Sequence, residues 1–163
     1  MNPTRARSTP HFLFALVILL SIASHAEAQT RRVVVSLPDR TLSLVENGEV
    51  VRMFPVAVGA PHTPTPVGTF TIKNRIPHPT YYRPGRVIAP GPSNPLGTRW
   101  MGLDIKGYGI HGTDEPQSIG HARSHGCVRL HNDDVEQLFE LLRPGDIVEL
   151  RNEPVTMTVK EGR

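Results

Sequence analysis

The chain is divided into short runs of alternating and β-branched residues, and Gly- or Pro-containing turns separate these runs. They begin with "RRVVVSL" and "TLSLVE", continue with "EVVRMFPVAV" and "GTFTIKNRI", and close with "DIVELR" and "PVTMTVK". Alternation with a period of two is typical of strands that bury one face. The dipeptide Asn47-Gly48 between two such runs predicts a tight hairpin. Pro55 lies inside the next run and indicates an edge strand or a bulge.

Only one segment has a helical period. Its apolar residues fall at i, i+3, i+4 and i+7, and they are Val135, Leu138, Phe139 and Leu142. Asp133 and Glu136 form a capping-box pattern that predicts the start of the helix, and "RPG" predicts its end. The strands and this helix together predict a mainly β domain, a sandwich or partly closed barrel, with one α-helix after the cysteine loop.

Residues 1–28 have the pattern of a secretory signal peptide. Two arginines precede the apolar run Phe12–Leu20, and small residues offer a cleavage site after Ala28. The run is shorter than the roughly 20 residues that span a bilayer, so an uncleaved anchor is the weaker alternative. We therefore expect residues 29–163 to be exported as one domain, with no membrane span after cleavage. The absence of a lipoprotein cysteine and of a wall-binding repeat favours a free periplasmic protein, and we expect it to be a monomer.

Charge and proline content restrict the partners and the loops. The 18 Lys and Arg residues and 15 Asp and Glu residues are scattered along the chain, and no basic block indicates a nucleic-acid partner. Residues 77–99 contain many prolines and no regular period, which predicts a long irregular loop over the surface. Ordered loops of this kind commonly form lids or the walls of binding sites.

Cys127 is the only cysteine, so it cannot form a disulfide within the chain. One interpretation is a buried, small hydrophobic residue. Four histidines nevertheless surround it, and catalytic cysteines are usually paired with a histidine because the thiolate is the nucleophile. His111 ends a predicted strand, and Cys127 precedes the strand-like "VRL". We therefore predict that the two face each other across neighbouring strands.

The residues next to Cys127 suit acyl chemistry. Gly126 precedes the thiol and can adopt a backbone conformation that other residues avoid. The N–H groups of Gly126 and Cys127 are predicted to hold the oxyanion of a tetrahedral intermediate. Arg129 would share a face with Cys127 in an extended segment, where its guanidinium could grip a substrate carboxylate.

Zinc binding is the alternative chemistry. Candidate ligands are His111, His121, His125, Cys127 and His131. Their spacing lacks the usual CxxC or HxxxH pairs, and the glycine before the cysteine fits a nucleophile turn better than a closed tetrahedral site. We therefore predict no metal site and no cofactor.

The stretch "HGTDEPQSIGHARSHGCVRL" resembles the catalytic signature of the L,D-transpeptidase (YkuD) family. That signature is a histidine, a spacer, Ser/Thr-x-Gly-Cys, a small aliphatic residue and often an arginine. The similarity extends to "VGAPHTPTPVGTFTI" and "NPLGTRWMGLDIKGYGIHGT", and covers about residues 32–150. It implies a YkuD-like β-sandwich with the thiol at the end of a groove, and an enzyme that acts on peptidoglycan stem peptides.

The resemblance also implies roles for individual residues. Cys127 would be the nucleophile and His111 its base, with the carbonyl of Gly112 orienting the imidazole. Ser124 and His125 would shape the pocket, and Arg129 would contact a substrate carboxylate or brace the loop.

The implied reaction releases D-Ala from a tetrapeptide stem through a thioester at diaminopimelate and transfers the acyl group to an amine. Carbapenem-type lactams would trap this thioester. An L,D-carboxypeptidase and a silent peptidoglycan-binding module are the alternatives.

Overall fold

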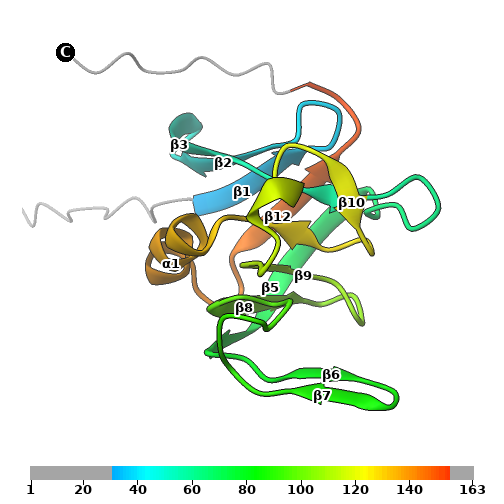
Figure 1. The fold of residues 1–163 in the computed structure, drawn as a ribbon. Helices are drawn as coiled ribbons and strands as arrows, with labels where there is room; N and C mark the ends of the chain where they lie inside the picture. Colours follow the sequence, from blue (N-terminus) through cyan, green and yellow to red (C-terminus); the bar gives the residue numbers. More distant parts are fainter. Residues whose placement is uncertain (1–30, 155–163) are drawn as a thin grey trace, which may run out of the picture.

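A computed structural model describes residues 31–154 (Figure 1), so the predicted signal peptide and most of the predicted strand "PVTMTVK" lie outside the described residues. The described chain contains twelve strands, one α-helix and one 3-10 turn. In chain order they are β1 (Arg31–Ser36), β2 (Thr41–Glu46), β3 (Glu49–Pro55), β4 (Val58–Gly59), β5 (Gly68–Pro77), β6 (Tyr81–Arg83), β7 (Arg86–Ile88), β8 (Arg99–Leu103), β9 (Gly109–His111), η1 (Pro116–Ser118), β10 (Ala122–Ser124), β11 (Val128–Arg129), α1 (Asn132–Leu141) and β12 (Ile147–Arg151).

The strands form one curled eight-stranded sheet and two small pairs. The order in the large sheet is β11-β9-β8-β5-β12-β1-β2-β3, and the small pairs are β10-β4 and β6-β7. Within the large sheet β1 runs parallel to β12 and β11 parallel to β9, while the other neighbours are antiparallel. The predicted fold class, mainly β with one α-helix after the cysteine loop, is confirmed. No helix within residues 31–154 has the length and apolar character needed to cross a bilayer.

The predicted hairpin at Asn47-Gly48 joins β2 to β3. Both residues have positive φ, 51° and 85°, which is the backbone that a tight two-residue hairpin turn requires. Pro55 is the last residue of β3, and β3 lies at an edge of the sheet, so the edge-strand prediction is also confirmed. Proline is largely confined to such positions in sheets because it has no N–H to donate to a ladder hydrogen bond.

The core lies between the curled sheet and α1. Val33 and Val35 of β1 point into the main core, whereas Val34 joins Val45 and Val50 in a small cluster on the other face. The four periodic apolar residues of the helix are buried, as its sequence predicted. The helix packs against β8 and β9, and this places the strand of His111 on a rigid support.

The capping-box prediction is wrong. The helix begins at Asn132, and His131 occupies the N-cap position without a side-chain cap hydrogen bond. Asp133 therefore lies within the first turn, where its charge faces the positive end of the helix dipole. The side chain of Asn132 is directed to two neighbouring loops instead, as described below.

The segment 77–99 is more regular than its prolines predicted. The sequence "YYRPGRVI" forms the hairpin β6-β7, with Gly85 at a φ of 74° in its turn. Buried Asn94 holds the segment together, because its amide donates to the carbonyls of Pro79 (2.8 Å), Ile88 (3.2 Å) and Ala89 (3.1 Å). These hydrogen bonds hold the segment in one conformation, although its prolines prevent a long helix or strand.

Candidate active site

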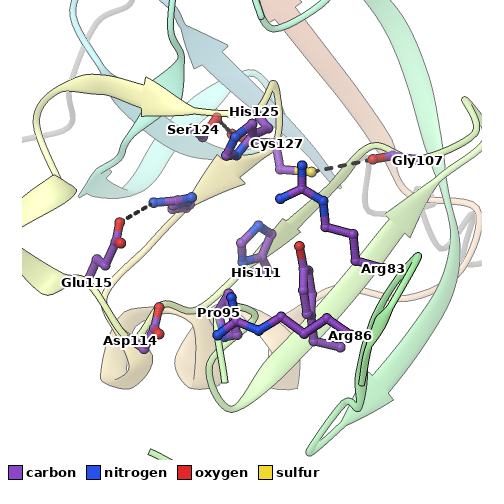
Figure 2. Close-up of a pocket in the computed structure, with 12 residues that line it drawn as sticks. Arg83, Arg86, Pro95, Gly107, His111, Asp114, Glu115, Ser124, His125 and Cys127 are labelled. Carbon is purple, nitrogen blue, oxygen red and sulfur yellow. Dashed lines mark hydrogen bonds and ion pairs between the residues drawn. The ribbon is translucent and has the colours of Figure 1, made fainter. Parts of the chain in front are cut away.

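His111 and Cys127 line the same pocket, which has a volume of about 490 Å³ (Figure 2). The strands β9 and β11 are adjacent and parallel, with Ile110 opposite Val128 and His111 opposite Arg129. Cys127 immediately precedes β11. The two residues that the sequence placed on neighbouring strands therefore come together at the end of one strand pair.

Burial and one hydrogen bond fix the state of the His111 ring. Its Nδ1 lies 2.6 Å from the carbonyl oxygen of Gly112, and because a carbonyl only accepts, Nδ1 carries the proton. Nε2 is then left with a lone pair. The ring also stacks on Trp100, with centroids 5.6 Å apart. The pKa of His111 is lowered to about 4, mainly by burial; the Gly112 bond acts against this shift, and the Arg129 charge adds to it. At neutral pH the imidazole is thus uncharged and can accept a proton.

The loop before the thiol is closed by buried Ser124. Its hydroxyl donates to the carbonyl of Cys127 (2.5 Å) and accepts the N–H of Gly126 (3.0 Å). Gly126 has a φ of 109°, and a Cβ there would lie 2.6 Å from the ring of Tyr108. Only glycine fits this turn. The N–H of Gly126 is already used within the loop, which departs from the prediction that it points at an oxyanion.

The thiol of Cys127 is half-buried and donates weakly to the carbonyl of Gly107 (3.6 Å). Burial raises the pKa of Cys127, and this effect outweighs the bond to the Gly109 backbone and the charge of Arg129, which lower it. A raised thiol pKa beside an imidazole of low pKa means that the resting pair is neutral. Proton transfer from sulfur to nitrogen then has to accompany attack on a substrate.

Arg129 has a fixed place in the wall of the pocket. Its guanidinium pairs with Glu115 (2.9 Å), and its backbone exchanges two hydrogen bonds of 2.9 Å with Ala57. Of the two roles that the family resemblance implies, the contacts within the protein match the bracing role. His125 lines the pocket and is exposed, so its side chain is accessible to a substrate.

Several pocket residues were not singled out in the sequence. They are Tyr81, Arg83, Arg86, Pro95, Gly107, Asp114 and Glu115. Four of them belong to segment 77–99, which was expected to form a lid or wall. The turn dipeptide Pro84-Gly85 between "YYR" and "RVI" was the signal that could have located the hairpin.

The five candidate zinc ligands do not gather around one point. Among residues 31–154, His, Cys, Asp and Glu side chains form no group of three or more that could hold a metal ion.

Comparison with known proteins identifies relatives of this site and fold. The family model described as the L,D-transpeptidase catalytic domain, YkuD, matches residues 30–150. The YkuD protein of Bacillus licheniformis, which carries the name of an L,D-transpeptidase, is 42% identical over 73% of this chain and 64% of its own length.

Two solved structures share the fold. An L,D-transpeptidase from Mycobacterium smegmatis is 25% identical, with a TM-score of 0.64 over 76% of this chain and 59% of its own. The L,D-transpeptidase LdtMt1 in complex with imipenem is 24% identical, with a TM-score of 0.63 over the same shares. The chain thus spans less than two thirds of the length of each relative.

Proposed function

The chain belongs to the L,D-transpeptidase catalytic-domain (YkuD) family, and from this premise we propose that it is an exported enzyme that remodels peptidoglycan stem peptides through a cysteine thioester. One observation carries the proposal. The Nδ1 proton of His111 is held by Gly112, so Nε2 is the free base in the pocket that also holds the only thiol of the chain.

In the first step, Cys127 attacks the carbonyl at the L-centre of diaminopimelate in a tetrapeptide stem. The thiol proton passes to Nε2 of His111 as the S–C bond forms, and the C–N bond to the terminal D-Ala then breaks. The imidazolium returns the proton to the leaving amine. Because its pKa is about 4, His111 is a weak base but a strong acid once protonated, which favours this return.

In the second step, an amine attacks the thioester and His111 accepts its proton. The S–C bond then breaks and the imidazolium returns the proton to sulfur, which restores the thiol of Cys127. The amine of another diaminopimelate would give a 3-to-3 cross-link. A lipoprotein lysine or a free D-amino acid is an equivalent nucleophile, and water would make the enzyme an L,D-carboxypeptidase. All these outcomes share the first step.

The oxyanion formed in both steps needs at least one hydrogen-bond donor. We assign this role to the N–H of Cys127, since Ser124 already binds the N–H of Gly126. Ser124 acts by holding the turn, and exposed His125 can contact the substrate.

We also propose that the mature enzyme is a monomer in the periplasm, without nucleic-acid partners. The signal-peptide pattern supports the location, and Pro55 at the end of edge strand β3 disfavours pairing between molecules. Light scattering of the purified protein tests the oligomeric state.

The test of the reaction is intact-mass spectrometry of the mature protein with a disaccharide-tetrapeptide, with products separated by liquid chromatography. We expect an acyl adduct on wild type and none on Cys127→Ala. A dimer linked between two diaminopimelates supports the transpeptidase, and a tripeptide alone supports the carboxypeptidase. An untouched muropeptide with no adduct would favour the binding module.

The same instrument tests inhibition. We expect imipenem to acylate wild type and not Cys127→Ala, because the lactam carbonyl is a strained mimic of the acyl donor. Acylation of another residue would contradict the assigned nucleophile.

A further inference from the structure

Two arginines at the tip of the β6-β7 hairpin have no structural role that the contacts explain. Arg83 and Arg86 are directly opposite each other across the hairpin, on either side of the Pro84-Gly85 turn. Like charges at opposed positions destabilise a strand pair. Neither guanidinium forms an ion pair or side-chain hydrogen bond with the residues that the structure describes. A local conflict of this kind is typical of functional sites.

The alternation of the hairpin directs both arginines toward the pocket. The neighbouring pair, Tyr82 and Val87, points outward and is 75% and 67% exposed. Arg83 and Arg86 are on the opposite face, with Tyr81, and all three line the pocket of Cys127. In Figure 2 the Arg83 side chain extends from the hairpin toward Cys127.

The pocket lining carries three arginines and two carboxylates, so its net charge is positive. Glu115 is already paired with Arg129, so Asp114 is the remaining carboxylate of the lining. His111 is uncharged at neutral pH because burial lowers its pKa to about 4. The hairpin side of the pocket therefore presents positive charge to a ligand near the thiol.

We propose that Arg83 and Arg86 form a carboxylate-binding site that selects donor peptides with a free terminal carboxylate. This inference rests on the proposed function, because in a tetrapeptide the terminal carboxylate is the anion nearest to the scissile carbonyl. Guanidinium groups suit it, since they bind carboxylates through two parallel hydrogen bonds. Anion binding would also relieve the repulsion between the two arginines.

The first experiment does not depend on the proposed function. Cys127 is alkylated with iodoacetate, an anion, and with neutral iodoacetamide, and the ratio of the two rates is measured. We expect the double variant Arg83→Gln/Arg86→Gln to lower this ratio about fivefold to tenfold, with the iodoacetamide rate unchanged. The wild-type ratio should also fall as salt is raised, because salt screens exposed charges.

Two matched variants control this result. Arg52→Gln removes an arginine from β3 at the far edge of the sheet and should leave the ratio at its wild-type value. Arg83→Lys/Arg86→Lys keeps the charge and should retain much of the preference for iodoacetate. A double Gln variant with the wild-type ratio and salt response overturns the proposal.

The second experiment uses a tetrapeptide donor and its C-terminal amide. We expect the amide to raise KM about tenfold in wild type, with a smaller change in kcat, and to have little further effect in the double Gln variant. Equal use of acid and amide donors by wild type overturns the carboxylate site. If neither donor acylates Cys127, the proposed function fails while the alkylation ratio still tests the arginines.

Discussion

At the scale of single residues, the proposed chemistry starts from a neutral cysteine–histidine pair. Burial opposes charge on both groups, so it raises the pKa of Cys127 and lowers that of His111. Both shifts disfavour the thiolate–imidazolium form at rest. The thiol is then protected from chance electrophiles. A bound substrate would favour the attack, because its carbonyl oxygen accepts the N–H of Cys127 and its presence excludes water from the pocket.

Alkylation measures this state directly. We expect the iodoacetamide rate at Cys127 to rise about tenfold for each pH unit between pH 6 and pH 8, because only the small thiolate fraction reacts. His111→Gln should give the same slope. A rate that is flat over this range in wild type, and not in the variant, would instead indicate a resting thiolate–imidazolium pair.

The low pKa of His111 also has a consequence for stability. The folded protein holds His111 at a pKa of about 4, below the ordinary value of 6.5, so the unfolded chain binds more protons in this range. Its contribution to stability is full above pH 6.5 and is lost as the pH falls toward 4. We expect a loss of about 2 kcal/mol in the free energy of unfolding between pH 7 and pH 5 from this residue.

Urea unfolding at both pH values checks this expectation. In His111→Gln, the free energy of unfolding should fall by about 2 kcal/mol less between pH 7 and pH 5 than in wild type. In His62→Gln, which changes an exposed histidine, it should fall by as much as in wild type. An equal pH dependence in wild type and His111→Gln would contradict the buried, neutral state.

At the scale of elements, Asn132 connects three parts of the site. Its Oδ1 accepts the N–H groups of Thr98, near the end of segment 77–99, and of Thr113, which follows the His111 strand (both 3.2 Å). Its Nδ2 donates to the carbonyl of Thr113 (3.0 Å). A Cβ on Gly112 would collide with the same Oδ1, so a glycine at this position is what allows the Asn132 amide to approach the loop. The first residue of α1 thus positions the loop whose carbonyl orients His111.

Asn132→Ala should lower the free energy of unfolding by about 2 kcal/mol, because it leaves partly buried N–H groups without an acceptor. We also expect slower acylation by imipenem, since the Gly112–Thr113 loop loses its support. Urea unfolding and intact-mass kinetics measure the two effects. Asp133→Ala is the matched control and should cost no more than about 0.5 kcal/mol, because Asp133 makes no cap. Similar losses for the two variants would contradict the positioning role of Asn132.

At the scale of the whole molecule, the stabilising core and the specificity-bearing hairpin are separate. The buried apolar core comes from the large sheet, β4, Val56, Leu130 and α1 with Leu142, and no residue of β6 or β7 belongs to it. The hairpin is instead fixed through Asn94 at its base. Such a division allows the hairpin to vary in sequence without loss of the fold.

Replacement of residues 81–88 by a Gly-Ser linker should therefore change the free energy of unfolding by no more than about 1 kcal/mol. Acylation by the tetrapeptide should fall at least about tenfold, because one wall of the pocket is removed. Urea unfolding and intact-mass kinetics separate the two effects. Loss of cooperative unfolding would show that the hairpin contributes to the core.

The sequence by itself determined the features that local chemistry controls. Period-two alternation, Asn47-Gly48 and the helical period of the last element predicted strands, a hairpin and one helix, because each depends on neighbours a few residues apart. The family signature likewise predicted roles for His111, Gly126 and Cys127 within one short stretch, and these roles stay predictions.

Only the tertiary structure decided which distant groups meet. The sequence predicted a capping box at Asp133 and Glu136, whereas in the structure the amide of Asn132 binds Thr98 and Thr113, and no local pattern encodes that choice. The arginines of the hairpin reach the pocket because strand pairing sets their face, and the neutral state of His111 and Cys127 follows from burial. Burial and long-range contacts are properties of the packed chain, so they appear only when the sheet has curled around its core.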